Sequence, residues 1–235
     1  MQVREIKSAF SDRFGKEPLI IRSPGRINLI GEHTDYNNGF VLPAAIDKSI
    51  VVAIAANDSN FSKAIALDLD ESFEFSLANV QPLDTGDWRN YLLGVISEIQ
   101  KLGKEIGNFN LIFGGDIPIG AGLSSSAALE NGIAFGLNEL FALGLSKLEM
   151  VQASHRAENS FAGVKCGIMD QFANMFGENG KALFLDCRSF DYESIDIDLD
   201  GLEIILIDSK VKHKLAESKY NKRRETCEKI SGLLN

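Results

Sequence analysis

One segment, residues 108–143, constrains the fold of this 235-residue chain more than any other. It starts with an apolar run typical of a β-strand, continues through a glycine-bearing loop with three consecutive serines, and ends in an apolar stretch of helical length. The loop, residues 118–126, is therefore expected between a strand and the N-terminus of a helix. Unpaired backbone N–H groups and the positive end of the helix dipole favour an anion such as phosphate there.

Neither of the two common nucleotide-binding loops matches this segment. A Walker A loop requires Gly-Lys-Ser/Thr, and the loop holds no lysine, while a dinucleotide fingerprint requires a third glycine where Ser125 stands. A small-residue turn whose serines cap the helix is the alternative interpretation. Three serines exceed what one cap requires, and a serine hydroxyl beside phosphate could help to ligate Mg²⁺, which prefers oxygen ligands.

The rest of the chain mixes helical and strand patterns without a regular βαβ rhythm, which favours an α+β fold. Residues 2–14 and 88–103 have helical periodicity, and Ser146 with Glu149 predicts a capping box for a helix that runs to about Ser160. The final residues, 213–235, are also helix-like. The predicted strands are 18–22, ending at a break over Ser23, Pro24 and Gly25, then 48–57, 64–69, 73–77, 181–187 and 202–208.

A second polar segment, residues 22–39, crowds cationic, anionic and amide side chains next to an apolar strand. Glu32, His33 and Asp35 offer hydrogen-bond donors and acceptors at close spacing, which suits a ligand with many hydroxyls. An ordinary solvated turn is the alternative. A zinc site is disfavoured, because His33 lacks an H-E-x-x-H partner and the other histidines are distant in sequence.

Charge and cysteine content narrow the choice of partners and compartment. The net charge of −9 disfavours nonspecific attraction to nucleic acid or anionic lipid, so we expect neither partner. The three cysteines form no disulfide framework and no C-x-x-C pair, which is typical of reduced thiols in a cytoplasmic protein. No transmembrane helix or secretory signal is expected. The sequence does not identify a protein partner.

Four segments resemble known motifs. Residues 22–47, RSPGRINLIGEHTDYNNGFVLPAAID, resemble the galactokinase signature, and residues 118–130, PIGAGLSSSAALE, resemble the phosphate-binding motif of the GHMP kinase superfamily. Residues 166–171, CGIMDQ, are a third match, and residues 211–224 are similar to a later family segment. The resemblance implies a GHMP-kinase-like N-terminal domain of the ribosomal protein S5 domain 2-like fold over residues 1–200, with an incomplete second α/β domain over 201–235.

The resemblance also implies an activity, the transfer of phosphate from Mg-ATP to the C1 hydroxyl of α-D-galactose. By it, Asp170 would accept the proton of that hydroxyl, and Arg26 would orient Asp170 and stabilise developing charge. Such a pairing is physically reasonable, because a nearby guanidinium favours the charged form of a carboxylate. The resemblance further implies sugar contacts by Glu32, His33, Asp35, Gly167 and Tyr220, nucleotide contacts by Gly120, Ala121, Gly122, Leu123, Ser124, Ser125, Ser126 and Trp88, and Mg²⁺ ligation by Ser126 and Glu158.

Each of these roles has a structural alternative. Asp170 could be a helix cap or half of a salt bridge, Glu158 a solvated helix residue, Trp88 a core aromatic, and Tyr220 a surface ring. The alternating carboxylates of Asp196, Asp198 and Asp200 are better explained as the wet face of an edge strand than as a metal site.

Galactokinases are substantially longer than this chain, so we expect the strand 202–208 to expose apolar faces and the polypeptide alone to be unstable or weakly active. Two other functions stay open. One is phosphorylation of another sugar such as N-acetylgalactosamine. The other is a non-catalytic galactose and ATP sensor, although the serine loop, Arg26 and Asp170 resemble those of the family's enzymes rather than the disturbed loop typical of its regulators.

Overall fold

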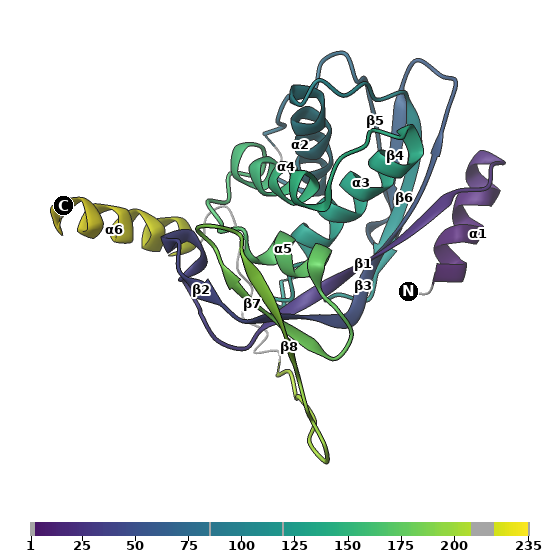
Figure 1. The fold of residues 1–235 in the computed structure, drawn as a ribbon. Helices are drawn as coiled ribbons and strands as arrows, with labels where there is room; N and C mark the ends of the chain where they lie inside the picture. Colours follow the sequence, from purple (N-terminus) through teal and green to yellow (C-terminus); the bar gives the residue numbers. More distant parts are fainter. Residues whose placement is uncertain (1–2, 85, 119, 208–218, 235) are drawn as a thin grey trace.

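The computed structural model describes residues 3–84, 86–118, 120–207 and 219–234, without the side chains of residues 219, 220 and 234 (Figure 1). Within these residues the chain forms an α+β fold with a five-stranded sheet, in the order β1-β3-β6-β4-β5, and a three-stranded sheet, in the order β2-β7-β8. The elements are α1 (Val3–Phe14), β1 (Leu19–Asn28), η1 (Asp35–Asn37), β2 (Phe40–Val41), β3 (Pro43–Ala56), β4 (Ser62–Ala66), η2 (Leu67–Leu69), β5 (Glu71–Phe75), α2 (Trp88–Lys101), β6 (Phe109–Gly115), α3 (Ser125–Phe141), α4 (Lys147–Ser160), α5 (Met169–Phe176), β7 (Lys181–Asp186), β8 (Tyr192–Asp196) and α6 (Lys219–Leu234).

The long strand β3 is buried on both faces of the larger sheet, which explains its nearly continuous apolar sequence. Val52 and Ile54 face the core formed with α2 and α3, whereas Val51 and Ala53 face α1 on the opposite side. Side chains alternate between the two faces of a strand, so one run of β-branched residues serves both layers. Figure 1 shows α1 on one side of this sheet and α2, α3 and α4 on the other.

The smaller sheet packs against α5. Val41, Leu183 and Leu185 form an apolar cluster with Ile168 and Phe172. Phe172 is almost completely buried, and burial of one such side chain contributes about 1.5–3 kcal/mol. This packing fixes α5, a helix of only eight residues, between the two sheets.

Several sequence-based expectations are confirmed. The helix predicted over 2–14 forms as α1 from Val3, residue 2 lying outside the described residues, and the one predicted over 88–103 forms as α2 but ends at Lys101. Ser146 and Glu149 make the predicted capping box at the start of α4. The strand over 48–57 is present but begins earlier, at Pro43. In the described part of the chain, no helix is both long and apolar enough to cross a membrane.

The predicted break at Ser23–Gly25 is wrong, because β1 continues to Asn28. The pairing of β1 with β3 shifts register between Pro24 and Arg26 and then resumes. Proline cannot donate to a ladder, but a local bulge accommodates it while the flanking residues keep their partners. The predicted strand over 64–69 is also too long, since β4 ends at Ala66 and a short 3-10 helix follows.

The predicted strand over 202–208 is likewise wrong for residues 202–207, which have no regular structure, while residue 208 lies outside the described residues. Ile205 and Ile207 are 78% and 89% exposed. A strand needs a neighbour to satisfy its backbone, and no described segment pairs with this one. Asp196 is exposed on the edge strand β8 as expected, but Asp198 and Asp200 lie beyond its end. The domain division at residue 200 stays a prediction.

Candidate active site

The serine loop approaches β1 closely because residue 25 is glycine. A Cβ at Gly25 would lie 2.8 Å from the carbonyl oxygen of Leu123 and 3.1 Å from Ile117. The backbone N–H of Arg26 donates to the same Leu123 carbonyl at 3.2 Å. The glycine therefore lets the loop lie directly on the strand, which places the next residue, Arg26, at the loop.

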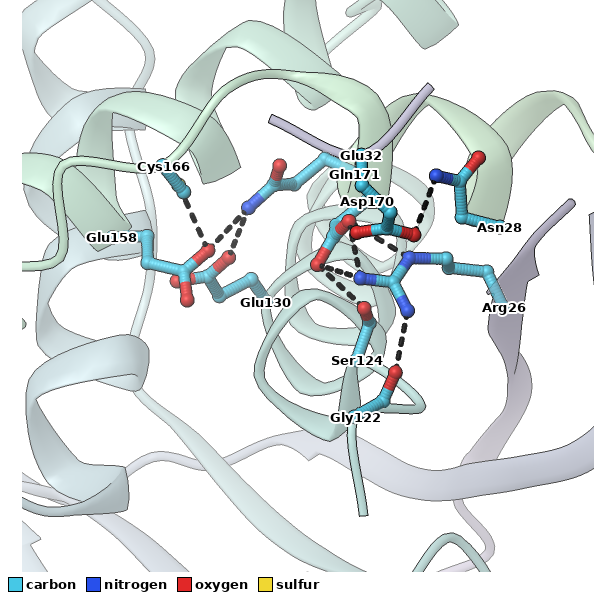
Figure 2. Close-up of polar contacts among 10 residues, drawn as sticks. All are labelled: Arg26, Asn28, Glu32, Gly122, Ser124, Glu130, Glu158, Cys166, Asp170 and Gln171. Carbon is cyan, nitrogen blue, oxygen red and sulfur yellow. Dashed lines mark hydrogen bonds and ion pairs between the residues drawn. The ribbon is translucent and has the colours of Figure 1, made fainter. Parts of the chain in front are cut away.

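Arg26 and Asp170 meet beside this loop (Figure 2). Nε of Arg26 donates to Oδ1 of Asp170 at 2.8 Å, and Nη2 donates to Oδ2 at 2.8 Å. The remaining terminal nitrogen donates to the carbonyl of Gly122 at 2.6 Å. Both side chains are mostly buried, at 14% and 22% exposed. Asp170 therefore does form a salt bridge, as the structural alternative predicts, and this contact is compatible with a catalytic role.

Ser124 does not cap α3 with its side chain, contrary to the alternative interpretation of the loop. Its backbone is left-handed, with φ of 58°, and its hydroxyl donates to Oδ2 of Asp170 at 2.5 Å. Gly120 and Gly122 also have positive φ, of 75° and 74°, which glycine adopts readily. The loop thus turns a serine hydroxyl toward the carboxylate.

A buried polar cluster lies on the other side of Asp170, formed by Glu130, Glu158, Cys166 and Gln171 (Figure 2). The amide of Gln171 donates to Glu158 at 2.6 Å and to Glu130 at 3.1 Å. The thiol of Cys166 donates to the same oxygen of Glu158 at 3.3 Å. Ser126 lies close enough to the Glu158 carboxylate to lower its pKa. Glu158 is 4% exposed, so its interpretation as a solvated helix residue is wrong.

Burial dominates the electrostatics of this cluster. Desolvation raises the pKa of Glu158, the charge of Asp170 raises it further, and hydrogen bonds from Ser126, Cys166 and Gln171 oppose the change. Desolvation and the nearby Glu158 hold the pKa of Glu130 well above its usual range. The same burial raises the pKa of the Cys166 thiol well above its usual value, so this cysteine is not a reactive thiolate.

Ser126 and Glu158 fit the Mg²⁺ implied by the resemblance. They bring a hydroxyl and a carboxylate together, which are hard oxygen ligands. Among the described residues, no group of three or more His, Cys, Asp or Glu side chains could hold a metal by itself. Few protein ligands are typical of Mg²⁺ that enters a site with substrate phosphates.

The polar segment after β1 places Asp35 against residue 167. Asp35 begins the 3-10 helix η1 and is 8% exposed, and a Cβ at Gly167 would overlap its carboxylate. Glu32 accepts a hydrogen bond from Asn28 at 2.7 Å, and His33 is paired with the hydroxyl of Tyr36 at 2.7 Å. Glu32 and His33 are exposed. The predicted sugar contacts of these residues remain predictions.

Of the other predicted site residues, Trp88 lies in the apolar core rather than in the cluster around Asp170. Trp88 belongs to the core cluster, where it is 8% exposed, packs edge-on against Phe73 and Phe113, and donates to Glu71 at 2.7 Å. This is the geometry of the core-aromatic alternative, and a nucleotide contact by Trp88 stays a prediction. The side chain of Tyr220 lies outside the described residues.

Sequence reasoning singled out neither Glu130 nor Gln171, although both lie in recognised motifs. Glu130 carried a signal, since it is a charged residue inside the apolar run of α3. A carboxyl group on an apolar helix face either interrupts the apolar pattern or is buried together with a hydrogen-bond partner. The second case holds here, because Glu130 is fully buried and accepts from Gln171.

Comparison with known proteins finds family matches for the N-terminal polar segment and for the region that contains the serine loop. Residues 8–56 match the galactokinase galactose-binding signature, and residues 90–178 match the N-terminal domain of GHMP kinases. The solved structure of Lactococcus lactis galactokinase complexed with galactose is similar with a TM-score of 0.88 and 37% identity, over 99% of this chain and 62% of that one. Methanococcus jannaschii mevalonate kinase, with a TM-score of 0.66 and 21% identity over 79% of this chain and 58% of that one, shares the fold.

The fold and its glycine- and serine-bearing loop are therefore those of the GHMP kinase superfamily, and the predicted fold class is confirmed. Curated galactokinases are similar in sequence. The one from Thermosipho africanus is 47% identical over 88% of this chain and 57% of its own length, and the one from Clostridium perfringens strain 13 is 41% identical over 97% and 60%. The chain belongs to the galactokinase family and spans about three fifths of the length of these relatives.

Proposed function

We propose that this protein transfers the γ-phosphate of ATP to the C1 hydroxyl of α-D-galactose, which gives galactose 1-phosphate and ADP. The observation that carries the proposal is the convergence of Arg26, Asp170 and Ser124 at the phosphate-binding loop. The galactose complex of the Lactococcus lactis relative supports the choice of sugar. Galactose and ATP are accordingly the proposed partners. We propose that the protein acts in the cytoplasm and binds neither nucleic acid nor a membrane.

Asp170 would accept the proton of the C1 hydroxyl and hold the sugar oxygen in line with the phosphoryl group. Arg26 fixes the carboxylate through two hydrogen bonds and brings a positive charge to the loop where phosphate is expected. Phosphoryl transfer depends mainly on such positioning and charge stabilisation, because its transition state is loose.

The nucleotide would lie on the loop that precedes α3, where backbone N–H groups and the helix dipole favour phosphate. Ser126 and Glu158 would hold Mg²⁺, which when bound with ATP offsets the negative charge of the transferred group. Glu32, His33, Asp35 and Gly167 would contact sugar hydroxyls, and such polar contacts discriminate strongly against an epimer that leaves them unpaired.

Sugar-dependent ADP release from the purified chain tests the proposal. We expect weak release with galactose, still less with glucose or N-acetylgalactosamine, and a phosphorus NMR signal from a sugar 1-phosphate. Asp170→Asn, which keeps the shape of the side chain, should lower turnover about 10²–10⁴-fold.

Three results would count against the proposal. Faster turnover of N-acetylgalactosamine would indicate another sugar kinase of the superfamily. Calorimetric binding of galactose and a nonhydrolysable ATP analogue without ADP release would indicate a sensor. Full activity of Asp170→Asn would remove the assigned base.

A further inference from the structure

Gln171 lies between two buried carboxyl groups, an arrangement that neither the phosphate loop nor the sugar contacts explain (Figure 2). Its amide nitrogen has two hydrogens, and it donates to Glu158 at 2.6 Å and to Glu130 at 3.1 Å. Glu130 and Gln171 are fully buried, and Glu158 is 4% exposed. Both amide hydrogens are thus committed to carboxylate oxygens in the interior.

The position of Glu158 is fixed from three directions. Gln171 approaches from α5, Ser126 from the first turn of α3, and Cys166 from the segment that precedes α5. Of these three contacts, the one from Gln171 is a short hydrogen bond of 2.6 Å, whereas the thiol of Cys166 is a weak donor at 3.3 Å. The orientation of Glu158 therefore depends mainly on the Gln171 amide.

Gln171 also follows Asp170 directly in the first turn of α5. Successive side chains on a helix point about 100° apart, so one turn presents Asp170 to Arg26 and Gln171 to α3 and α4. Asn131 of α3 donates to the backbone carbonyl of Gln171 at 2.7 Å and holds this turn in place. A change in the Gln171 contacts would thus move Glu158 relative to Asp170.

We propose that Gln171 is a positioning residue, which orients the carboxylate of Glu158 for a divalent cation and sets its separation from Asp170. The inference rests on the proposed function, because Glu158 is a metal ligand only if the chain binds a metal–nucleotide complex. Glu130 acts as the second acceptor that keeps the Gln171 amide from rotating away. Partners that orient a metal ligand typically contribute tenfold to hundredfold to metal affinity.

Gln171→Met tests this proposal, because methionine has a similar length and volume but no donor. Binding of Mn²⁺ to the chain in the presence of ADP, measured by electron paramagnetic resonance, should weaken about tenfold or more. Galactose affinity by calorimetry should stay within about twofold, since no sugar contact changes. Gln100→Met is the matched control, because the side chain of Gln100 donates to the carbonyl of Leu77, on a different part of the fold.

A second variant distinguishes an effect on the orientation of Glu158 from a general loss of protein stability. Glu130→Gln keeps an oxygen that can accept from Gln171, so Mn²⁺ affinity should stay within about threefold of the wild type. Equal loss of Tm in Gln171→Met and Gln100→Met, with Mn²⁺ affinity unchanged in both, would overturn the proposal. So would a wild-type chain that binds no Mn²⁺ with ADP. Because these measurements need no turnover, absence of ADP release would contradict the proposed function without deciding the role of Gln171.

Discussion

Arg26 and Asp170 are separated by 144 residues of sequence, yet the guanidinium of the first donates two hydrogen bonds of 2.8 Å to the carboxylate of the second. A third hydrogen bond, to the Gly122 carbonyl, fixes the guanidinium plane on the phosphate-binding loop. The pair therefore connects β1, α5 and the loop before α3. Such a bidentate contact defines the direction of the carboxylate as well as its charge.

Arg26→Lys should lower kcat about 10²-fold or more, because an ammonium group is a point charge that cannot make the planar two-bond contact or reach Gly122 as well. Steady-state ADP release with galactose measures the effect. Arg22→Lys is the matched control, since Arg22 lies on the same strand and donates to Ser49 and to the carbonyl of Asp47. Similar rates for wild type and Arg26→Lys would contradict the assigned role.

The sequence predicts Arg26 and Asp170 as a pair only through their motifs, because no local pattern relates positions so far apart. It predicts Ser126 and Glu158 in the same way. Glu130 and Gln171 are different, since their importance depends on burial between α3, α4 and α5. Burial of a polar side chain follows from tertiary packing, which helical periodicity within a single segment does not determine.

Gly167→Ala should displace Asp35 and lower galactose affinity by more than about tenfold. The added methyl would overlap the Asp35 carboxylate and would lie 2.6 Å from its Cβ, closer than real side chains approach. Isothermal calorimetry with galactose measures the loss. Gly232→Ala on α6 is the control, because nothing lies within 4 Å of that position and alanine favours a helix. Unchanged galactose affinity in Gly167→Ala would show that Asp35 does not contribute to the sugar site.

The fold was predictable where local signals and packing agree. The capping box of Ser146 and Glu149 formed as expected, because both halves of the motif lie within four residues. The break expected near Pro24 did not form, since pairing with β3 on both sides outweighs the missing N–H group. The strand predicted over residues 202–207 was wrong for the opposite reason. These residues have a strand-like pattern, but no described strand pairs with them.

His155 gives the fold a pH dependence of known sign. Desolvation lowers its pKa, nearby Arg224 and Arg156 lower it further, and the hydrogen bond to the Cys166 carbonyl opposes them. Because that carbonyl can only accept, Nε2 carries the proton of a neutral imidazole. With the folded pKa below the unfolded value, the unfolded chain binds more protons at acidic pH. The contribution to stability is therefore present above the unfolded pKa of about 6.5 and is lost as pH falls through the folded pKa.

His155→Gln should reduce this dependence, because glutamine can donate to the Cys166 carbonyl but does not titrate. Thermal unfolding at pH 8 and pH 5 measures it, and Tm of the wild type should fall by a few degrees more than Tm of the variant. Comparison with the variant is needed because Glu98 and Glu149, whose pKa values are lowered, also lose stability in acid, while Glu158, whose pKa is raised, acts in the opposite direction. Equal decreases in both proteins would show that His155 does not contribute to the acid sensitivity of the fold.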